Sequence, residues 1–372
     1  MRIPPARVVI PEADRIALRE DFERVLATGQ LTLGPFTQAL ETEFAEVVEA
    51  EFAVAVNSGT SALEIICRCI GVVGRKVIVP TNTFFATAAA VLHAGGRVVF
   101  TDVAEHMMLD TKLLEDAIDA DTAAVIVVHI GGFIHPEIEE IAEICSRKRV
   151  ALIEDAAHAH GSELRNQDAG TFGTAAAFSF YPTKVMTSGE GGIIVSNDPG
   201  LVRRARIFRD QGKADFGANY HIELGYNWRM SELHAALGLK QLRRLSEFVA
   251  VRRRVAATYD SGFDNLGSLV PYQRDATSNP NYYKYVVFLS RGRNRAEAKA
   301  RLKRDFQISL SGEVYDTPCH LQPVFRDERV ILHGEMSRAE DLCSRHFCLP
   351  VYSDMTASEA EYVVDAMRTV FS

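Results

Sequence analysis

A lysine and an aspartate near the middle of the chain have the residue types and the setting of a catalytic pair. Asp155 comes just after the apolar run Val150–Ile153, which has the composition of a buried strand. Lys184 follows a second apolar run, Ala175–Phe180, and precedes the glycine-rich turn Gly189–Gly192. Because the carboxyl ends of parallel strands share one edge of a sheet, the two side chains can reach the same crevice.

The amine of a lysine becomes a covalent catalyst when it forms a Schiff base, most often with pyridoxal 5'-phosphate (PLP). In such a site a carboxylate pairs with the pyridine nitrogen of PLP and keeps it protonated, so that the ring accepts electrons. Lys184 and Asp155 suit these two roles. Each also has an ordinary alternative, a solvated surface lysine and a structural aspartate. The pair therefore needs support from the rest of the sequence.

Strand-like apolar segments alternate with helical segments along the first half of the chain. This alternation predicts an α/β fold with a mostly parallel sheet, helices on both faces and a site at the carboxyl ends of the strands. The expected strands are Phe52–Val56, a segment that ends at Pro80, Val98–Thr101 and one that ends near His129; helices are expected from Ala62 onward, over Ala86–His93 and over Glu137–Cys145.

A hydroxyl-rich turn, Ser58–Ser61, separates the first strand from the helix expected from Ala62. Free N–H groups at a helix N-terminus, together with hydroxyl side chains, can bind an anion such as a phosphate. An ordinary N-cap uses the same residue types. The turn alone is consistent with both interpretations.

Three motifs carry a resemblance to a known family: EDAAHAHGS at 154–162, FSFYPTK at 178–184 and GEGG at 189–192. In this order and spacing they resemble the DegT/DnrJ/StrS sugar aminotransferases, which are PLP enzymes of fold type I. The resemblance implies a three-layer large domain with a mostly parallel sheet and a smaller α+β domain. It also implies that Lys184 forms the Schiff base and that Asp155 pairs with the pyridine nitrogen.

The resemblance further implies how the rest of the cofactor is held. Gly59, Thr60 and Ser179 match the family's positions for the PLP phosphate, and Phe84 matches an aromatic residue that stacks on the ring. His158 stands where glutamine is usual, facing the ring oxygen of the cofactor. A histidine can donate a hydrogen bond there, but its charge depends on pH.

Asn227 precedes a helix expected over Met230–Leu245. In the family the matching asparagine reaches across a dimer interface to the phosphate of the neighbouring cofactor. The resemblance therefore implies a homodimer with shared active sites. From the sequence alone, a loop asparagine in a turn stays open as the alternative.

The resemblance implies transfer of an amino group from L-glutamate to a nucleotide-linked keto sugar. The segments TKVMTSGEGG, YYKY and GEVYDTPCHLQPV resemble family members that act at C4 more than members that act at C3. This resemblance favours a dTDP-4-keto-6-deoxyhexose as the acceptor. Lys213 and Arg229 are candidates to bind its diphosphate. Tyr315 and His320 are candidates to contact the sugar, with loop shaping as the alternative for each.

Other functions are consistent with the same motifs. The enzyme could act at C3 of a sugar, or form an aminocyclitol or an aminohydroxybenzoate. A non-enzymatic regulatory protein with the PLP fold is a more remote alternative, because Lys184 and Asp155 are both present. The lysine also favours transamination over the dehydration performed by relatives with histidine at that position.

The length of 372 residues predicts two domains, a large PLP-binding domain at 1–245 and a small C-terminal domain at 246–372. The net charge of −8 argues against nucleic-acid binding. No Cys/His spacing predicts a metal site, and the six cysteines suit free thiols in a reducing cytoplasm. No apolar run predicts a signal peptide or a membrane span, so we expect a cytoplasmic protein. Further helices are expected over 12–30, Phe36–Ala50, Ser246–Tyr259 and Arg295–Phe306.

Overall fold

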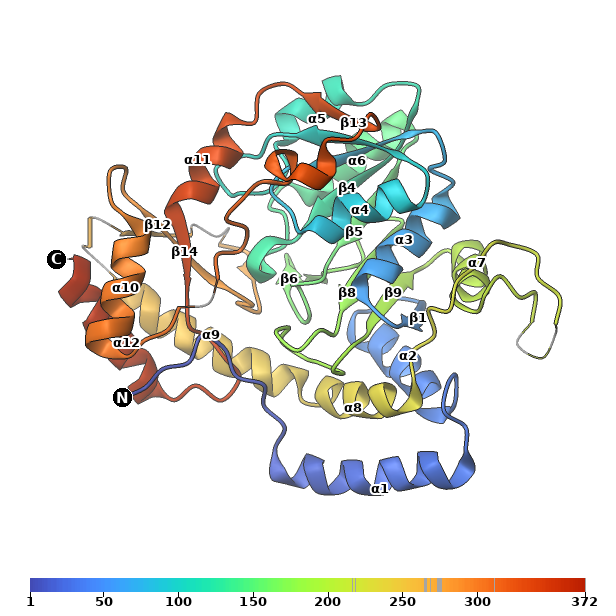
Figure 1. Cartoon of the computed structure of the whole chain (residues 1–372), viewed down its shortest axis with the longest axis horizontal. Helices are drawn as coiled ribbons and strands as arrows, with labels where there is room; N and C mark the ends of the chain where they lie inside the picture. Colours follow the sequence, from blue (N-terminus) through green and yellow to red (C-terminus); the bar gives the residue numbers. More distant parts are fainter. Residues whose placement is uncertain are drawn as a thin grey trace.

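An eight-stranded sheet forms the centre of the larger part of the molecule (Figure 1). The computed structural model describes residues 1–215, 217, 219–263, 266–267, 269–272, 276–310 and 312–371. The strand order is β1-β9-β8-β5-β4-β2-β3-β13; β9 is antiparallel to both neighbours, and the other neighbouring pairs are parallel. The predicted α/β fold with a mostly parallel sheet is confirmed. The strands are β1 (Phe52–Val56), β2 (Lys76–Pro80), β3 (Arg97–Thr101), β4 (Thr122–Val128), β5 (Ala151–Asp155), β8 (Ala175–Ser179), β9 (Gly192–Ser196) and β13 (Val330–His333).

Side chains on the two faces of this sheet enter two different apolar clusters. On β4, Val125 and Val127 lie in one cluster with residues of α2, α5, α6 and α8, whereas Ala124 and Ile126 lie in the other with residues of α3, α4 and α7. This alternation follows from the two-residue period of a strand. Because both faces are covered, the central strands are apolar throughout, and the sequence shows them as uninterrupted runs. The helices are α2 (Pro35–Val47), α3 (Gly59–Ile70), α4 (Phe85–His93), α5 (Thr111–Ala117), α6 (Ile138–Lys148), α7 (Pro199–Arg209) and α8 (Glu232–Leu242).

The smaller part of the molecule has its own three-stranded sheet and its own apolar cluster. Its sheet has the order β10-β12-β14, and α9, α10 and α12 gather beside it (Figure 1). The bounds of α10 are those predicted, Arg295–Phe306. The elements are β10 (Leu269–Pro271), β12 (Tyr285–Leu289), β14 (His346–Leu349), α9 (Leu245–Gly262), α10, α11 (Ser337–Arg345) and α12 (Ala357–Phe371); a third small sheet joins β6 (Glu163–Leu164), β7 (Gln167–Asp168) and β11 (Ser278–Asn279).

Two segments cross the predicted boundary near residue 245. The strand β13 comes from the C-terminal portion of the chain but pairs with β3 in the large sheet. In the other direction, Ile3 bridges Ile308 and lies in the apolar cluster of the smaller part. The division into residues 1–245 and 246–372 stays a prediction, and the structure adds these two crossings to it.

Most of the predicted helices differ from the observed ones by one to three residues at an end, and two of these differences bear on the packing and the site. The helix expected over Met230–Leu245 ends at Leu242, and a turn at Arg243 and Arg244 separates it from α9. That turn allows α8 to pack on α2 while α9 packs on α12. The helix expected from Ala62 begins earlier, at Gly59, because the Ser58 side chain caps its N-terminus. The first helix is α1 (Glu12–Thr28), within the predicted span.

Candidate active site

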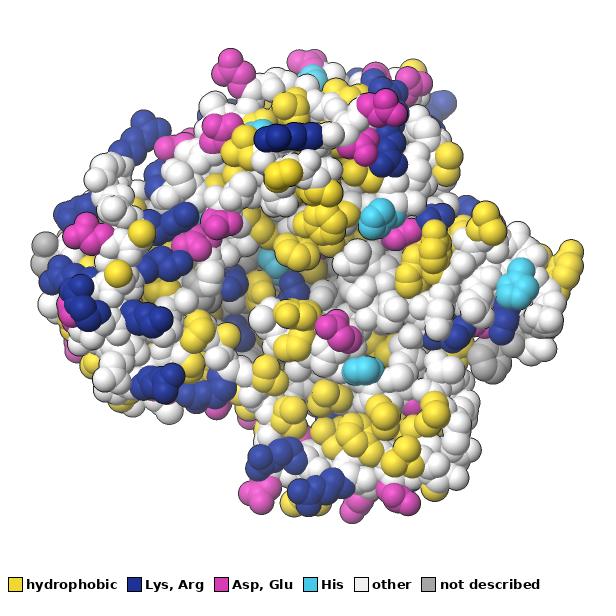
Figure 2. Space-filling view, in the orientation of Figure 1, with side chains coloured by type: hydrophobic (Ala, Val, Ile, Leu, Met, Phe, Trp, Pro, Cys, Tyr) yellow, Lys and Arg dark blue, Asp and Glu magenta, His cyan; other side chains and the backbone are white. Residues whose placement is uncertain are grey.

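A cavity of about 500 Å³ lies where the carboxyl ends of β5 and β8 meet the N-terminus of α3. Figure 2 shows the surface hollowed between the sheet-bearing part and the smaller part, with basic and histidine side chains visible in the hollow. The cavity brings together most of the residues predicted for the site from distant parts of the chain. These are Gly59, Thr60, Phe84, Asp155, His158, Ser179, Lys184 and Tyr315.

Asp155 is the last residue of β5 and is 5% exposed. Its carboxylate accepts a hydrogen bond from Thr87 Oγ1 at 2.6 Å and one from the Ala157 N–H at 3.2 Å. Burial raises the pKa of Asp155, while these two hydrogen bonds and the positive charge of Lys184 act in the opposite direction. A carboxylate held in this way at the cavity wall still has acceptor capacity for a cationic group of a ligand.

Lys184 lies in the turn after β8 and also lines the cavity. Its Nζ is 4.9 Å from the centre of the Tyr283 ring. Burial lowers the pKa of this amine, against the opposing effects of Tyr283 and Asp155. A lowered pKa increases the fraction of uncharged amine, which is the form that attacks a carbonyl carbon.

The N-terminus of α3 forms the third wall of the cavity. The Ser58 hydroxyl accepts a hydrogen bond from the Ser61 N–H at 3.0 Å, and the helix begins at Gly59. A Cβ at Gly59 would lie 2.8 Å from Ser179 Cβ, so the close approach of α3 to β8 requires glycine at this position. Gly59, Thr60 and Ser179 thus place backbone N–H groups and hydroxyls beside one another, as an anion such as a phosphate requires.

His158 is buried and its ring stacks on Tyr283, with 4.3 Å between the ring centres. Burial, together with the charges of Lys184 and Lys284, holds the pKa of His158 well below its usual value. The ring is therefore neutral, and its Nδ1 accepts a long hydrogen bond of 3.4 Å from the Gly131 N–H. The remaining nitrogen, Nε2, then carries the proton and can donate a hydrogen bond.

The sequence of this chain matches a known protein family over nearly its whole length. The sequence model of the DegT/DnrJ/EryC1/StrS aminotransferase family matches residues 13–368. The chain belongs to this family. The predicted resemblance is thereby confirmed.

Similar proteins of this family include named sugar transaminases. The dTDP-3-amino-3,4,6-trideoxy-alpha-D-glucose transaminase of Micromonospora megalomicea subsp. nigra is 33% identical over 97% of this chain and 96% of its own. The GDP-perosamine synthase of Escherichia coli O157:H7 is 31% identical over 91% of each chain. The crystal structure of S. venezuelae DesV is 31% identical and has a TM-score of 0.90, covering 99% of this chain and 98% of that one. This aminotransferase is therefore an enzyme of the PLP-dependent sugar-aminotransferase class.

The residues that line the cavity fit PLP. The α3 N-terminus with Ser179 suits a phosphate, and the buried Asp155 suits a protonated ring nitrogen. Phe84 lines the cavity and is 59% exposed, so its aromatic side chain is accessible to a flat ring. Lys184 supplies an amine for the aldehyde carbon. Each chemical feature of the cofactor thus has a matching group on the chain.

Asn227 lies outside the residues that line this cavity. It is exposed, its backbone forms a bridge with Asp210, and its carbonyl oxygen accepts a hydrogen bond of 3.4 Å from Asn57 Nδ2. The prediction placed this side chain in the active site of a second copy of the chain, so its position on the surface of one chain is consistent with that role.

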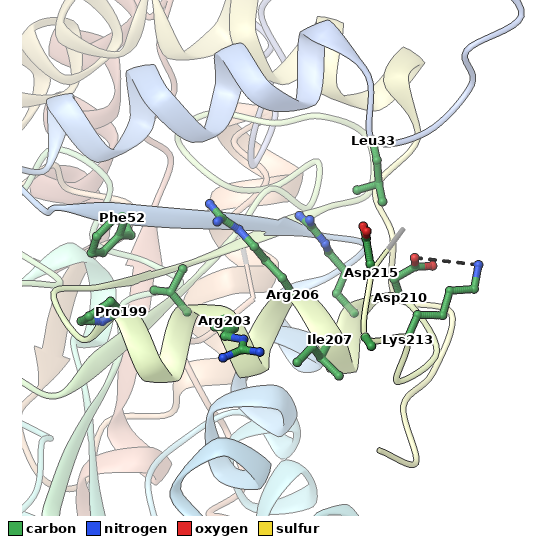
Figure 3. A pocket seen from close by; sticks show the side chains of 12 residues that line it. Leu33, Phe52, Pro199, Arg203, Arg206, Ile207, Asp210, Lys213 and Asp215 are labelled. Carbon is green, nitrogen blue, oxygen red and sulfur yellow. Dashed lines mark ion pairs between the residues drawn. The ribbon is translucent and has the colours of Figure 1, made fainter. Parts of the chain in front are cut away.

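Lys213 and Arg229 converge on Asp210 rather than on the active-site cavity. Lys213 Nζ is 4.0 Å from a carboxylate oxygen of Asp210, and Arg229 donates a hydrogen bond to the other oxygen. Asp210 and Lys213 line a separate pocket of about 380 Å³ beside α7 (Figure 3). Within one chain, these two cations are compensated by a carboxylate of their own.

The two residues predicted to contact the sugar have different positions. Tyr315 lines the cavity, and its ring centre is 6.1 Å from that of His158. His320 does not line the cavity; its Nδ1 lies 2.7 Å from Thr81 Oγ1 and its Nε2 lies 3.1 Å from Glu340. Both ring nitrogens of His320 therefore already have partners in the fold.

Sequence reasoning missed several cavity residues. Tyr283, Lys284 and Glu313 line the cavity, and Thr87 holds Asp155 from α4. Tyr283, Lys284 and Glu313 lie in the segments YYKY and GEVY. The sequence marked these segments only as similar to family members and assigned no site role to these three residues. Thr87 gave no signal, because a threonine inside an alanine-rich helix has an ordinary composition.

Proposed function

We propose that this aminotransferase carries PLP on Lys184 and transfers the amino group of L-glutamate to C4 of a dTDP-linked 4-keto-6-deoxyhexose. The product would be a dTDP-4-amino-4,6-dideoxyhexose for deoxyaminosugar biosynthesis. The observation that carries the proposal is the meeting of the Lys184 amine and the Asp155 carboxylate in one cavity of about 500 Å³. PLP, when bound there, supplies an electron sink for the bonds at the amino-bearing carbon.

Each residue of the cavity has a defined task in this proposal. Gly59, Thr60 and Ser179 bind the phosphate, and Asp155 keeps the ring nitrogen protonated. The amine of Lys184 moves a proton between the donor's α-carbon and the C4′ carbon of the cofactor, as general base and then general acid. Its lowered pKa supports this task, because the uncharged amine must be present to accept the proton.

The neutral ring of His158 supports a hydrogen bond from Nε2 to the ring oxygen of the cofactor. This bond does not depend on pH in the physiological range, because the pKa of His158 is well below its usual value. The histidine can therefore perform the task of the glutamine that is usual at this position.

Transfer to C3 is a second candidate. Relatives at 33% and 34% identity are named as transaminases that form a 3-amino sugar linked to dTDP, whereas two others are named GDP-perosamine synthases. The sequences of the lysine motif and of the YYKY segment favour transfer to C4 of the sugar. The aminocyclitol and aminohydroxybenzoate alternatives have no support among these named relatives.

A panel of acceptors tests the position and the nucleotide. The PLP-loaded protein is incubated with L-glutamate and with dTDP-, UDP- and GDP-linked 4-keto sugars and a dTDP-linked 3-keto isomer. The products are identified by mass spectrometry and NMR. We expect the highest kcat/KM with the dTDP-4-keto sugar. A higher value with the 3-keto isomer or with another nucleotide would refute this assignment and leave the aminotransferase class intact.

We further propose a homodimer in which Asn227 of each chain completes the site of the other. Figure 2 shows apolar side chains gathered over α8 and the neighbouring part of α1. Leu233 on α8 and Leu31 in the segment after α1 are exposed. The segment before Asn227 also exposes Tyr220 and Leu224. Exposed apolar side chains near Asn227 and on α8 support a protein interface at this surface.

Mixed dimers test this proposal. A chain with Lys184→Ala and a chain with Asn227→Ala are each expected to be inactive or weak alone. One site of their mixed dimer has both groups intact, so mixing should restore activity. A fully active monomer by light scattering would contradict the shared site.

The described part of the chain has no helix that combines the length and the apolar character required to span a bilayer. The six cysteines are free thiols, five of them buried, which supports a reducing cytoplasm as the place of action. The acidic net charge supports small-molecule substrates rather than nucleic acid as partners.

A further inference from the structure

A second cavity, of about 210 Å³, adjoins the active-site cavity. Thr183, Tyr283 and Lys284 line both cavities, so these three residues form a shared wall. The rest of the lining comes from the N-terminal segment 5–7, from Pro182, from Arg252 on α9 and from residues of the smaller part. We call this second space the side cavity.

Three cationic residues line the side cavity, and the described residues that line it include no carboxylate. Arg7 has anionic partners elsewhere, Asp354 at 3.1 Å and Glu359 at 3.4 Å. Arg252 and Lys284 form no ion pair with a carboxylate in the described ranges of the chain. The side cavity therefore carries an excess of positive charge.

Arg252 is buried, with 4% of its surface exposed. Its guanidinium donates hydrogen bonds only to neutral groups: the carbonyls of Tyr282 and Val351 and the hydroxyl of Ser353, at 3.1 to 3.2 Å. Its Nη2 has no hydrogen-bond partner among the described residues. Burying a guanidinium without an anion costs free energy, and a ligand carboxylate would offset that cost.

Lys284 connects the side cavity to the reactive amine. Its Nζ is 5.4 Å from the centre of the Tyr283 ring, and Lys184 Nζ is 4.9 Å from the same point. Within the described part of the chain, no hydrogen bond or ion pair engages the Lys284 side chain. The two amines thus both contact Tyr283, a residue of the shared wall.

We propose that the side cavity binds a carboxylate of the amino donor, with Lys284 at the shared wall and Arg252 opposite the incoming anion. The proposal rests on the proposed function, in which L-glutamate brings its amino group to the active-site cavity. A donor whose amine is held near Lys184 can extend a carboxylate past Tyr283 to these two cations. The nucleotide sugar then keeps the remainder of the larger cavity.

Glutarate tests the side cavity apart from turnover, because it carries two carboxylates and no amine. Its binding to the cofactor-free protein is measured by isothermal titration calorimetry. We expect Lys284→Met and Arg252→Met each to weaken binding by about tenfold or more, since each removes a charge-assisted hydrogen bond. Arg252→Lys should restore part of the loss. Lys284→Met decides the question if Arg252→Met fails to fold, because among the described residues the Lys284 amine contacts the Tyr283 ring but forms no hydrogen bond or ion pair.

Arg253→Lys is the matched control. Arg253 lies on the same helix and donates to the backbone carbonyls of Pro280 and Asn279, but it lines neither cavity. It should leave glutarate binding unchanged. The proposal is wrong if glutarate does not bind the unaltered protein, if Lys284→Met binds it equally well, or if inorganic phosphate competes with equal affinity, which would indicate a general anion site.

Kinetics with the PLP-loaded protein separate this proposal from the proposed function. Release of 2-oxoglutarate from L-glutamate in the absence of any sugar tests the donor assignment, and its failure would leave the glutarate result unaffected. In Lys284→Met we expect a raised KM for the donor and an unchanged KM for the sugar. A raised KM for the sugar with an unchanged KM for the donor would overturn the side-cavity proposal. If Lys284→Met raises the KM for L-glutamate but not for L-alanine, the side-chain carboxylate of the donor binds in the side cavity. If it raises the KM for both donors equally, the α-carboxylate binds there.

Discussion

Glu154 and Asp155 are neighbours in the sequence and both are buried, but the two faces of β5 give them different surroundings. Glu154 accepts hydrogen bonds from the N–H groups of Gly170, Phe172 and Gly173 at 2.7 to 2.8 Å and lies 2.9 Å from His129 Nε2. Asp155 has two donors, Thr87 and Ala157, and lines the cavity. A carboxylate has about four acceptor positions, so the first is saturated by the fold and the second is not.

This difference separates a structural carboxylate from one that is available to a ligand. The three N–H donors to Glu154 come from the loop between β7 and β8, which the carboxylate fixes against the sheet. The donors around Asp155 orient it and leave acceptor capacity toward the cavity. Substitutions on the cavity face should therefore change catalysis, and substitutions on the loop face should change stability.

Among the residues that line the cavity, we expect the largest effect from Lys184→Ala. Turnover should fall by at least about 10⁴-fold, because the variant lacks both the covalent anchor and the proton carrier. The absorbance of the covalently bound cofactor should disappear, and the unfolding temperature should change little. Borohydride trapping followed by peptide mapping identifies the labelled lysine in the unaltered protein; a label on another lysine would refute this role.

Asp155→Asn should lower kcat by roughly 10²- to 10³-fold, because the neutral amide no longer holds the proton on the cofactor nitrogen. The side chain keeps its size and can still accept from Thr87, so folding should be nearly unaffected. Steady-state kinetics and thermal unfolding measured on the same sample check both statements. Near-normal turnover with PLP bound would show that a different carboxylate performs this task.

Glu154→Gln should reverse the pattern. An amide NH₂ would face backbone donors that now meet carboxylate oxygens, and the free energy of unfolding should fall by about 3 kcal/mol. Turnover per folded molecule should remain within a few fold of the unaltered protein. Denaturant titration with activity measured below the transition tests this. A variant that is stable but inactive would remove the contrast between the two faces.

The smallest effect is expected from Asp168. This carboxylate is partly buried, and nearby acidic groups disfavour its charged form. Burial raises its pKa to about 6, with Glu163 and Glu49 adding to the shift. A folded-state pKa above the unfolded value means that its stabilising contribution is complete below about pH 4 and is lost as pH rises through 6. Asp168→Asn should therefore stabilise the protein by about 1 kcal/mol at pH 7.5, after allowance for solvent screening.

At pH 4 the stability gain of Asp168→Asn should vanish, because the unaltered carboxyl is then largely protonated in both states. Thermal unfolding of the two proteins at both pH values makes the comparison. An equal gain at pH 4 and pH 7.5 would mean that the amide acts through packing rather than through charge.

The sequence alone determined the parts of this protein that depend on local pattern. The apolar runs around Ile153 and Phe178 predicted buried parallel strands, because strands covered on both faces lack polar alternation. The residues at the ends of these runs, Asp155 and Lys184, were predicted by type and position. Their meeting in one cavity follows from the rule that parallel strands end at the same edge.

Only the tertiary structure decided which buried polar groups have all their hydrogen-bond positions filled by the protein and which can still bind a ligand. Nothing in the letters ED distinguishes Glu154 from Asp155; the distinction arises when the 170–173 loop donates three N–H groups to one of them. Likewise, Arg252 and Lys284 looked like members of ordinary segments until folding placed them beside one cavity without an anion. Such compensation is a property of contacts between distant segments, and a single sequence does not contain it.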